Sequence, residues 1–200
     1  MKSGFLWLLI ISFGFFLLFS VIFVYQNKYN TKAKKYKCGE QIAIFNGVAI
    51  YYNDDNICKG RNLSIDGYNF GLKWQCVEFI KRYYYTVFLH KMPDSYGNAK
   101  DFFDTRLKDG EFNKQRGLYQ YAKISSAKPQ IHDIIIFDKH IFNPFGHIAI
   151  ISKVTDTQIE WVQQNVGLQT KDSCPLKKEN KQWHIQHGRV LGILRGFKNK

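Results

Sequence analysis

The residues of this chain best suited to chemistry are one cysteine and one histidine that lie far apart in the sequence. Cys76 stands in Gly71-Leu-Lys-Trp-Gln-Cys-Val-Glu-Phe, where an amphipathic helix is expected to begin, and His147 stands in Phe145-Gly-His-Ile-Ala-Ile. A thiolate nucleophile needs a helix N-terminus or a cationic neighbour to lower its pKa, and a base within hydrogen-bond reach. The two groups of such a pair meet only in the fold. The pattern therefore predicts cysteine-dependent hydrolysis through a thioester.

Each of these residues also has a purely structural interpretation. A lone cysteine in an amphipathic helix is more often a small core residue, and a histidine at the start of a strand is more often structural than catalytic. The remaining histidines are expected to be surface or structural residues, with His140 as the second candidate for the base. The order of Cys76 before His147, with polar residues on the strand after His147, favours the catalytic interpretation.

The hydrophobic pattern predicts the elements that would position this pair. Residues 75–88 carry apolar side chains at steps of three and four, as in a helix that buries one face, and a second helix is expected near residues 98–107. Residues 42–52 read as two strands around the turn dipeptide Asn46-Gly47. Four further strands are expected at residues 133–138, 147–154, 158–164 and 191–195. Consecutive strands without intervening helices predict an α+β domain with an antiparallel sheet.

The third member of the site depends on the register of one expected hairpin. Residues 155–157 connect the strand that starts at His147 to the following strand. If these three residues form the loop, His147 shares a face with Gln163 and Asn165, either of which could orient the imidazole. A slip of one residue would place Glu160, Val162 and Gln164 on that face instead. The loop lacks the residues of a two-residue turn, which favours the first register.

The beginning of the chain predicts a single-pass membrane anchor over residues 1–27. Residues 5–24 carry no charge and consist mainly of Leu, Ile, Phe and Val. Twenty helical residues span about 30 Å, the thickness of a hydrocarbon core. The run exceeds the roughly 7–15 apolar residues of a cleaved signal peptide, and no small-residue cleavage site follows it. An uncleaved anchor is therefore expected.

The net charge of +13 owes much to a lysine cluster in residues 28–40, the expected juxtamembrane linker. Such a cluster is typical of a topogenic and lipid-headgroup signal. Nucleic-acid binding would need basic residues interleaved with aromatic ones on the folded domain, so no nucleic-acid partner is expected. The positive-inside rule favours a cytoplasmic C-terminal domain, although the short leading tail leaves the membrane side open.

The remaining cysteines are Cys38, Cys58 and Cys174. Beside a nucleophilic Cys76 they form an odd set, which does not indicate a complete disulfide framework, so reduced thiols are expected. The chain has no C-x-x-C or H-E-x-x-H spacing. No metal and no cofactor are therefore expected.

At these residues the chain resembles the CHAP amidase family, and within it the amidase domain of bifunctional glutathionylspermidine synthetase/amidase. The resemblance runs from about residue 40 to 197 through Gly47-Val-Ala-Ile-Tyr, Lys73-Trp-Gln-Cys-Val-Glu-Phe, Asp133-Ile-Ile-Ile-Phe, Gly146-His-Ile-Ala-Ile-Ile, Gln164-Asn-Val and Leu191-Gly. It implies a papain-like α+β domain over residues 41–200, with the nucleophile helix packed on an antiparallel sheet. It also implies Cys76 as nucleophile, His147 as base, and Trp74, Gln75 and Lys81 as substrate-binding residues.

Two positions depart from the family pattern. Where the family reads Ala-Glu-Gln-Asn, this chain reads Val162-Gln-Gln-Asn. A glutamate would stabilise the imidazolium by its charge, whereas Gln163 can only orient the ring, as the amide does in Cys-His-Asn hydrolases. Lys81 stands where the family has an arginine, and an ammonium does not bind a carboxylate as a planar guanidinium does.

Two functions follow from these residues. The first is a membrane-anchored cysteine amidase or peptidase that cleaves an amide bond in a peptide or peptide conjugate, either glutathionylspermidine-like or a peptidoglycan peptide. The alternative, motivated by Gln163, is a catalytically silent CHAP-like binding module that holds a peptide or cell-wall fragment.

Overall fold

The computed structural model describes residues 15–24, 36–53, 58–93 and 97–196. The chain divides into two units, Met1–Lys37 and Cys38–Lys200. In the first unit, residues 15–24 are helical. Within the described part of the chain, no helix has the length and hydropathy needed to cross a bilayer. Much of the expected anchor, and most of the expected linker, lies outside the described residues.

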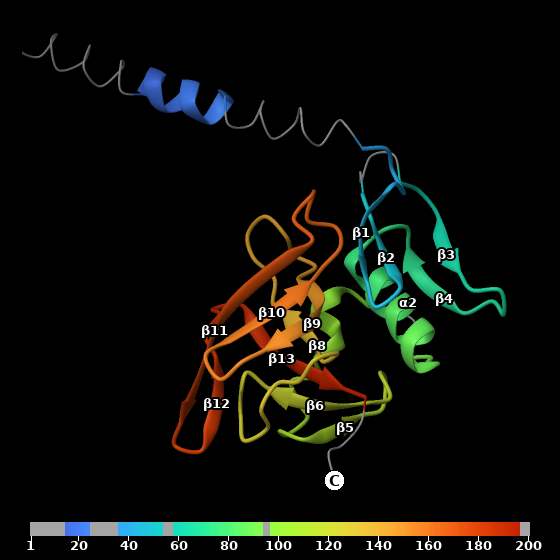
Figure 1. The fold of residues 1–200 in the computed structure, drawn as a ribbon, viewed down its shortest axis with the longest axis vertical. Coiled ribbons are helices and arrows are strands. Elements are labelled where there is room, and N and C mark those ends of the chain that lie inside the picture. Colours follow the sequence, from blue (N-terminus) through green and yellow to red (C-terminus); the bar gives the residue numbers. More distant parts are fainter. Residues whose placement is uncertain (1–14, 25–35, 54–57, 94–96, 197–200) are drawn as a thin grey trace, which may run out of the picture. The chain divides into compact units, whose positions relative to one another are not determined.

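The second unit is built on one antiparallel sheet (Figure 1). In the described residues this sheet has nine strands in the order β5-β6-β13-β8-β9-β10-β11-β12-β7. Its strands are β5 (Glu111–Asn113), β6 (Leu118–Ala122), β7 (Ile124–Ser125), β8 (Ile134–Phe137), β9 (His147–Val154), β10 (Gln158–Val162), β11 (Lys171–Glu179), β12 (Gln182–Ile185) and β13 (Val190–Arg195).

Among the described residues of the second unit, two hairpins and two helical segments accompany this sheet. They are β1 (Gln41–Phe45) with β2 (Val48–Tyr51), β3 (Arg61–Leu63) with β4 (Asn69–Leu72), the helix α2 (Cys76–Phe88) and the 3-10 helix η1 (Ala99–Phe102). The β1–β2 turn is made by Asn46 and Gly47, both at positive φ (47° and 78°), as a tight hairpin turn requires. The helix and this hairpin were expected from the sequence.

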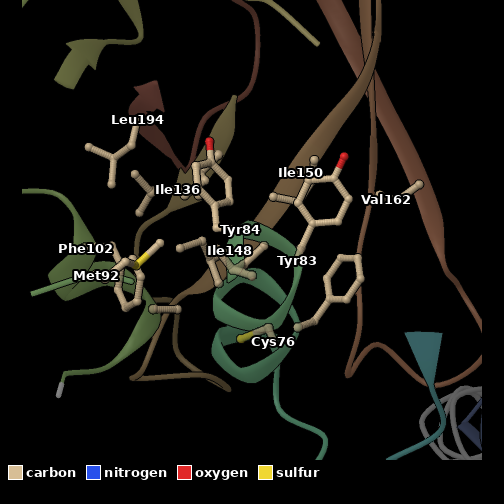
Figure 2. Packing of buried hydrophobic residues seen from close by; sticks show 14 of the residues in the cluster. Cys76, Tyr83, Tyr84, Met92, Phe102, Ile136, Ile148, Ile150, Val162 and Leu194 are labelled. Atoms are coloured by element: carbon tan, nitrogen blue, oxygen red, sulfur yellow. The ribbon is translucent and has the colours of Figure 1, made fainter. Parts of the chain in front are cut away.

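The central strands are buried on both faces because the sheet curls. Ile134 and Ile136 of β8 pack into a core with α2, as Figure 2 shows for Ile136. The alternate residues Ile135 and Phe137 pack into a second core. This second core consists of side chains from β6, β8, β9, β10, β11, β12 and β13, so the sheet closes over its own face. A helix packed on one face and a curled sheet on the other define the expected α+β architecture.

The expected helix at residues 98–107 is wrong in extent. Only η1 forms, and Phe103 after it is extended (φ −97°, ψ 119°). The Oδ1 of Asp104 accepts a hydrogen bond from the backbone N–H of Arg106 at 3.0 Å. This local side-chain bond stabilises a turn that competes with further helix formation.

Candidate active site

The nucleophile candidate Cys76 is the first residue of α2 (Figure 2). Gln75 before it is extended (φ −71°, ψ 163°), and the Gln75 carbonyl accepts the first helical hydrogen bond, from the N–H of Phe79. Glu78 lies in the first turn, where a carboxylate suits the positive end of the helix dipole. The Cys76 thiol is not in a disulfide and is buried at the edge of the α2 core. This position places the thiol at the positive end of the α2 dipole.

The base candidate His147 is the first residue of β9 and pairs with Phe137 of β8. Gly146 before it has a positive φ of 74°, and a Cβ there would lie 2.5 Å from the carbonyl oxygen of Phe137. Only glycine therefore lets the chain enter β9 in this position. Cys76 and His147 line the same cleft, which has a volume of about 950 Å³. The structure brings the two predicted residues to one site.

Gln163 fixes the imidazole of His147. The Gln163 Oε1 atom lies 3.1 Å from His147 Nε2 and also accepts the Trp161 indole N–H at 3.0 Å. The Gln163 Nε2 atom donates to the Gln169 carbonyl at 3.1 Å, which sets the orientation of the amide. Because an amide oxygen only accepts, His147 Nε2 carries the proton and Nδ1 is left as the acceptor. A neutral imidazole of this tautomer can take a proton from a thiol.

The register of the β9–β10 hairpin explains how Gln163 reaches His147. The expected three-residue loop is wrong: the Thr155 N–H donates to the Gln158 carbonyl at 2.9 Å, and Ile159 pairs with Val154, which is the slipped register. After a bulge, Val162 pairs with Ile150. The register beyond the bulge places Gln163 on the face of His147, as the first of the two considered registers predicts. The bulge itself was not expected from the sequence.

The pKa of His147 is lowered to about 4: burial is the largest cause, the hydrogen bond with Gln163 opposes it, and the Arg189 charge adds a smaller decrease. Burial removes water from the charged form of the ring, and the neutral Gln163 cannot replace that water with a negative charge. The His147 imidazole is therefore neutral over the physiological pH range.

Asn165 lies in the cleft but does not orient His147. It has a positive φ of 69°, and its side chain accepts from Asn53 Nδ2 at 2.6 Å and donates to Gln75 Oε1 at 2.5 Å. Asn165 thus holds Gln75, which also lines the cleft, next to Cys76. Of the two orienting candidates from the sequence, the structure gives the contact with the ring to Gln163.

A buried polar network that the sequence did not reveal supports the start of α2. Glu78 is fully buried and pairs with Arg82, whose Nε lies 2.6 Å from Glu78 Oε1. Gln164 Nε2 donates to Glu78 Oε2 at 2.8 Å and to the Gln75 carbonyl at 3.1 Å. The chain after β10 is thereby tied to the turn that carries Cys76. Gln164 belongs to the Gln164-Asn-Val block of the family resemblance, but the sequence did not indicate its contacts with Glu78 and Gln75.

Two of the predicted substrate-binding residues do not line this cleft. Lys81 is fully buried, its Nζ donates to the Asn69 carbonyl, and it lies 4.7 Å from the centre of the Tyr68 ring. Trp74 packs against Tyr51, with ring centres 4.2 Å apart. The structure gives both residues packing contacts. His140, the second base candidate, is exposed, bridges to Asn143, and is also not among the lining residues.

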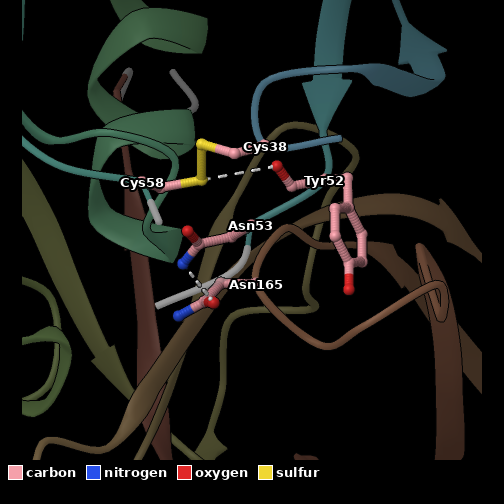
Figure 3. The surroundings of a disulfide bond; sticks show 5 residues. All are labelled: Cys38, Tyr52, Asn53, Cys58 and Asn165. Carbon is pink, nitrogen blue, oxygen red and sulfur yellow. Dashed lines mark hydrogen bonds between the residues drawn. A yellow bond between two sulfur atoms is a disulfide. The ribbon is translucent and has the colours of Figure 1, made fainter. Parts of the chain in front are cut away.

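The expectation that Cys38 and Cys58 are reduced thiols is wrong. They form a disulfide with a Cα–Cα distance of 5.6 Å (Figure 3). Cys58 Sγ lies 3.9 Å from the Tyr52 carbonyl, and Cys58 also lines the cleft. Counting cysteines missed the bond because the odd residue is Cys174, a buried thiol whose pKa is raised to about 11, mainly by burial.

Comparison with known proteins assigns this architecture to a class. Residues 67–165 match the family model described as "CHAP domain". The chain therefore carries a CHAP domain, the domain of a family of cysteine amidases and peptidases. The matched residues include both Cys76 and His147.

The similar curated proteins are much longer than this chain. It is 28% identical over 116 residues to "Glutathionylspermidine synthase" of Crithidia fasciculata, covering 54% of this chain and 16% of that protein. It is 30% identical over 133 residues to "Bifunctional glutathionylspermidine synthetase/amidase" of Escherichia coli (strain K12), covering 60% and 21%. A solved structure, "The crystal structure of Ly7917", matches with a TM-score of 0.35 and 13% identity, covering 60% of this chain and 53% of that one.

Proposed function

We propose that this chain is a cysteine amidase or peptidase that hydrolyses an amide bond in a peptide or peptide conjugate. The observation that carries the proposal is the meeting of Cys76 and His147 in one cleft, with Gln163 holding His147 as a proton acceptor at Nδ1. A thiol at a helix start and an oriented imidazole are the two parts that nucleophilic catalysis requires. The CHAP match supports the same chemistry.

The proposed reaction uses these groups in sequence. Cys76 Sγ forms a bond to the amide carbon while its proton passes to His147 Nδ1. Collapse of the tetrahedral intermediate breaks the C–N bond, and the imidazolium gives the proton to the leaving amine. Water then hydrolyses the thioester, with His147 again as base. Backbone N–H groups in the first turn of α2 are the proposed oxyanion donors, since a helix start presents such groups.

Two kinds of substrate are compatible with this proposal. The names of the similar proteins point to a glutathionylspermidine-like conjugate, and a peptidoglycan peptide is the alternative amide. Purified full-length chain is incubated with each of the two substrates separately. It should release a primary amine from one of them. Replacing Cys76→Ala should lower the rate by at least about a thousandfold. The matched control is Cys174→Ala, which removes the buried thiol of the second core. Full activity of Cys76→Ala would overturn the proposal.

A second candidate function has its own supporting observation. The neutral Gln163 and the lowered pKa of His147 make this pair a weak thiol activator, which favours a silent binding module for a peptide or cell-wall fragment. Such a module retains substrate binding in Cys76→Ala, and the unaltered chain forms no product. Calorimetric binding combined with the amine-release assay separates the two functions, because any turnover excludes the module.

We further propose that the domain is membrane-anchored through residues 5–24 and lies on the non-cytoplasmic side. The apolar run supports the anchor, and the Cys38–Cys58 disulfide supports an oxidising compartment. A cysteine introduced at the exposed Lys139 should react with a membrane-impermeant maleimide in intact cells. Labelling only after lysis would reverse the assignment.

A further inference from the structure

One rim of the cleft carries three cations. Lys59 and Arg61 are exposed and Lys73 is half-buried, and all three line the cleft with Cys76 and His147. Among the described residues that line the cleft, none is acidic. The rim therefore presents positive charge toward the site, in addition to the positive end of the α2 dipole.

The backbone holds these cations at the open end of the β3–β4 hairpin. Arg61, the first residue of β3, pairs with Leu72 at the end of β4. The N–H of Lys73 donates to the Gly60 carbonyl at 3.0 Å. Backbone pairing therefore holds residues 60–61 beside residues 72–73, and Lys59 directly precedes this paired segment.

The hairpin is in turn bound to the helix that carries Cys76. Asn62 follows Arg61 in β3, and its Nδ2 donates to Glu78 Oε1 at 2.8 Å. Gly71 has a φ of 127°, and a Cβ there would lie 3.6 Å from the backbone of Glu78, so β4 runs directly against the first turn of α2. The rim is thus part of the scaffold that positions the nucleophile.

Carboxylates elsewhere in the domain pair with other cations. Examples are Asp66 with Lys91 at 2.5 Å and Asp104 with Arg106 at 2.8 Å. In the part of the chain that the structure describes, the side chains of Lys59, Arg61 and Lys73 take part in no ion pair. Their charge is available to a ligand.

We propose that Lys59, Arg61 and Lys73 make this site select a peptide substrate that carries carboxylates beside the scissile amide, and reject a polycationic one. This inference rests on the proposed hydrolase function and names its substrate class. A cleft lined by charge of one sign raises the local concentration of oppositely charged ligands and speeds their association. A polyamine group on this side of the site is repelled, so an acidic peptide is the substrate that fits.

The test measures how the three rim charges change the rate at which Cys76 reacts with an anionic and with a neutral reagent. It does not require turnover. The full chain is alkylated with anionic iodoacetate and with neutral iodoacetamide, and modification of Cys76 is followed by peptide mass spectrometry. The triple variant K59Q/R61Q/K73Q should lower the iodoacetate-to-iodoacetamide rate ratio about fivefold in 10 mM salt, the order expected of several unit charges acting across a wet cleft. In 1 M salt the rim variant and the unaltered chain should give the same rate ratio, because charges more than about 3 Å apart are then largely screened.

The matched control is K114Q/K171Q/K177Q, which removes three exposed lysines that do not line the cleft. Its ratio should equal that of the unaltered chain. If the triple rim variant does not fold, K59Q and R61Q are measured singly, because both side chains are exposed. An unchanged ratio in the folded rim variants at low salt overturns the proposal, whereas absence of turnover alone overturns only the hydrolase function.

A second measurement determines which kind of anion, a peptide carboxylate or inorganic phosphate, binds at the rim. Tetraglutamate should slow iodoacetamide alkylation of Cys76 in the unaltered chain at low salt, and much less in K59Q/R61Q/K73Q. Tetralysine should not slow it. Protection by inorganic phosphate without protection by tetraglutamate at equal ionic strength would contradict the peptide assignment.

Discussion

Gln163 orients the His147 imidazole without adding charge to it. A carboxylate at this position would stabilise the imidazolium, whereas the amide oxygen of Gln163 accepts the Nε2 proton and leaves the ring neutral. In the proposed reaction, His147 is therefore neutral before it accepts the Cys76 proton. This difference affects both the pH dependence of the site and the strength of thiol activation.

The pH dependence of His147 gives the first prediction. Its pKa in the folded chain is about 4, below the ordinary 6.5, so the folded state binds fewer protons than the unfolded state in this window. The stabilisation is complete above about pH 6.5 and is lost as the pH falls through about 4. Urea unfolding between pH 7 and 4 should show a decline that is smaller in His147→Gln. The acid limb of hydrolysis should have its midpoint near pH 4; a midpoint near 6.5 would contradict the lowered pKa.

The substitution Gln163→Glu should raise the pKa of His147, because a negative charge beside the ring favours its protonated form. Alkylation of Cys76 by iodoacetamide should then remain fast at lower pH than in the unaltered chain. The variant should also lose about 1–3 kcal/mol of stability, because a carboxylate oxygen would replace the Nε2 that donates to the Gln169 carbonyl.

The control for that substitution is Gln163→Leu, which removes the side-chain hydrogen bonds with His147, Trp161 and Gln169 and adds no charge. Its Cys76 should react more slowly than in the unaltered chain at every pH. Equal pH profiles of Cys76 alkylation for the Glu and Leu variants would show that charge at residue 163 does not change the reactivity of the thiol.

The catalytic candidates themselves were predictable from sequence, because residue type and spacing identify Cys76 and His147. The choice between Gln163 and Asn165 was not, since both lie on the expected face of one strand. The structure separates them through backbone conformation: the positive φ of Asn165 comes with a side chain bonded to Asn53 and Gln75. Tertiary partners of that kind leave no local pattern in the sequence.

At the scale of elements, the start of α2 depends on the buried pair of Glu78 and Arg82. Glu78 has a fully buried side chain, and that of Arg82 is 13% exposed. Arg82 also donates to the Ala49 carbonyl at 2.9 Å, which joins β2 to the helix. The nucleophile helix, the first hairpin and the chain after β10 therefore share one polar network.

Replacing Arg82→Met should cost about 3–5 kcal/mol of unfolding free energy, because the Glu78 charge would remain buried without its cation. Chemical denaturation measures this loss. The matched control Lys91→Met removes an exposed ion pair with Asp66 and should cost less than about 1 kcal/mol. The double variant E78Q/R82M, which buries no charge, should recover part of the loss; a larger loss than in R82M would contradict the burial argument.

Elements with strong local patterns were predictable, and those that depend on distant partners were not. The helix Cys76–Phe88 and the strands around His147 follow from the spacing of apolar residues. Strand β11 was missed because only Cys174 and Leu176 are buried along Lys171–Glu179, which leaves no clear alternation to read. Its pairing with β10 and β12 decides its conformation.

At the scale of the whole molecule, the disulfide closes a loop at the edge of the cleft that Cys76 and His147 line. Cys38 and Cys58 are 20 residues apart in sequence. Asn53 lies between them and reaches Asn165 across the fold (Figure 3). The cross-link thus constrains the segment that supports one wall of the cleft, as well as the unfolded chain.

The double variant C38S/C58S should be less stable by about 3 kcal/mol, the cost of opening a loop of this size, with a thermal midpoint about 10 °C lower. Differential scanning calorimetry compares it with the unaltered chain and with C174A. Reducing agent should lower the midpoint of the unaltered chain and leave that of C38S/C58S in place. If reducing agent does not change the thermal midpoint of the unaltered chain, the result contradicts the disulfide.

The glutamine that orients His147 has a consequence at the level of the gene. Glutamine and glutamate codons differ by one base, CAA against GAA or CAG against GAG, so an amide-oriented site and a carboxylate-oriented site are one point mutation apart. Random mutagenesis with selection for faster hydrolysis should therefore reach residue 163 early. If the substitution is lost again once that selection is removed, the neutral amide benefits the organism by limiting the reactivity of Cys76.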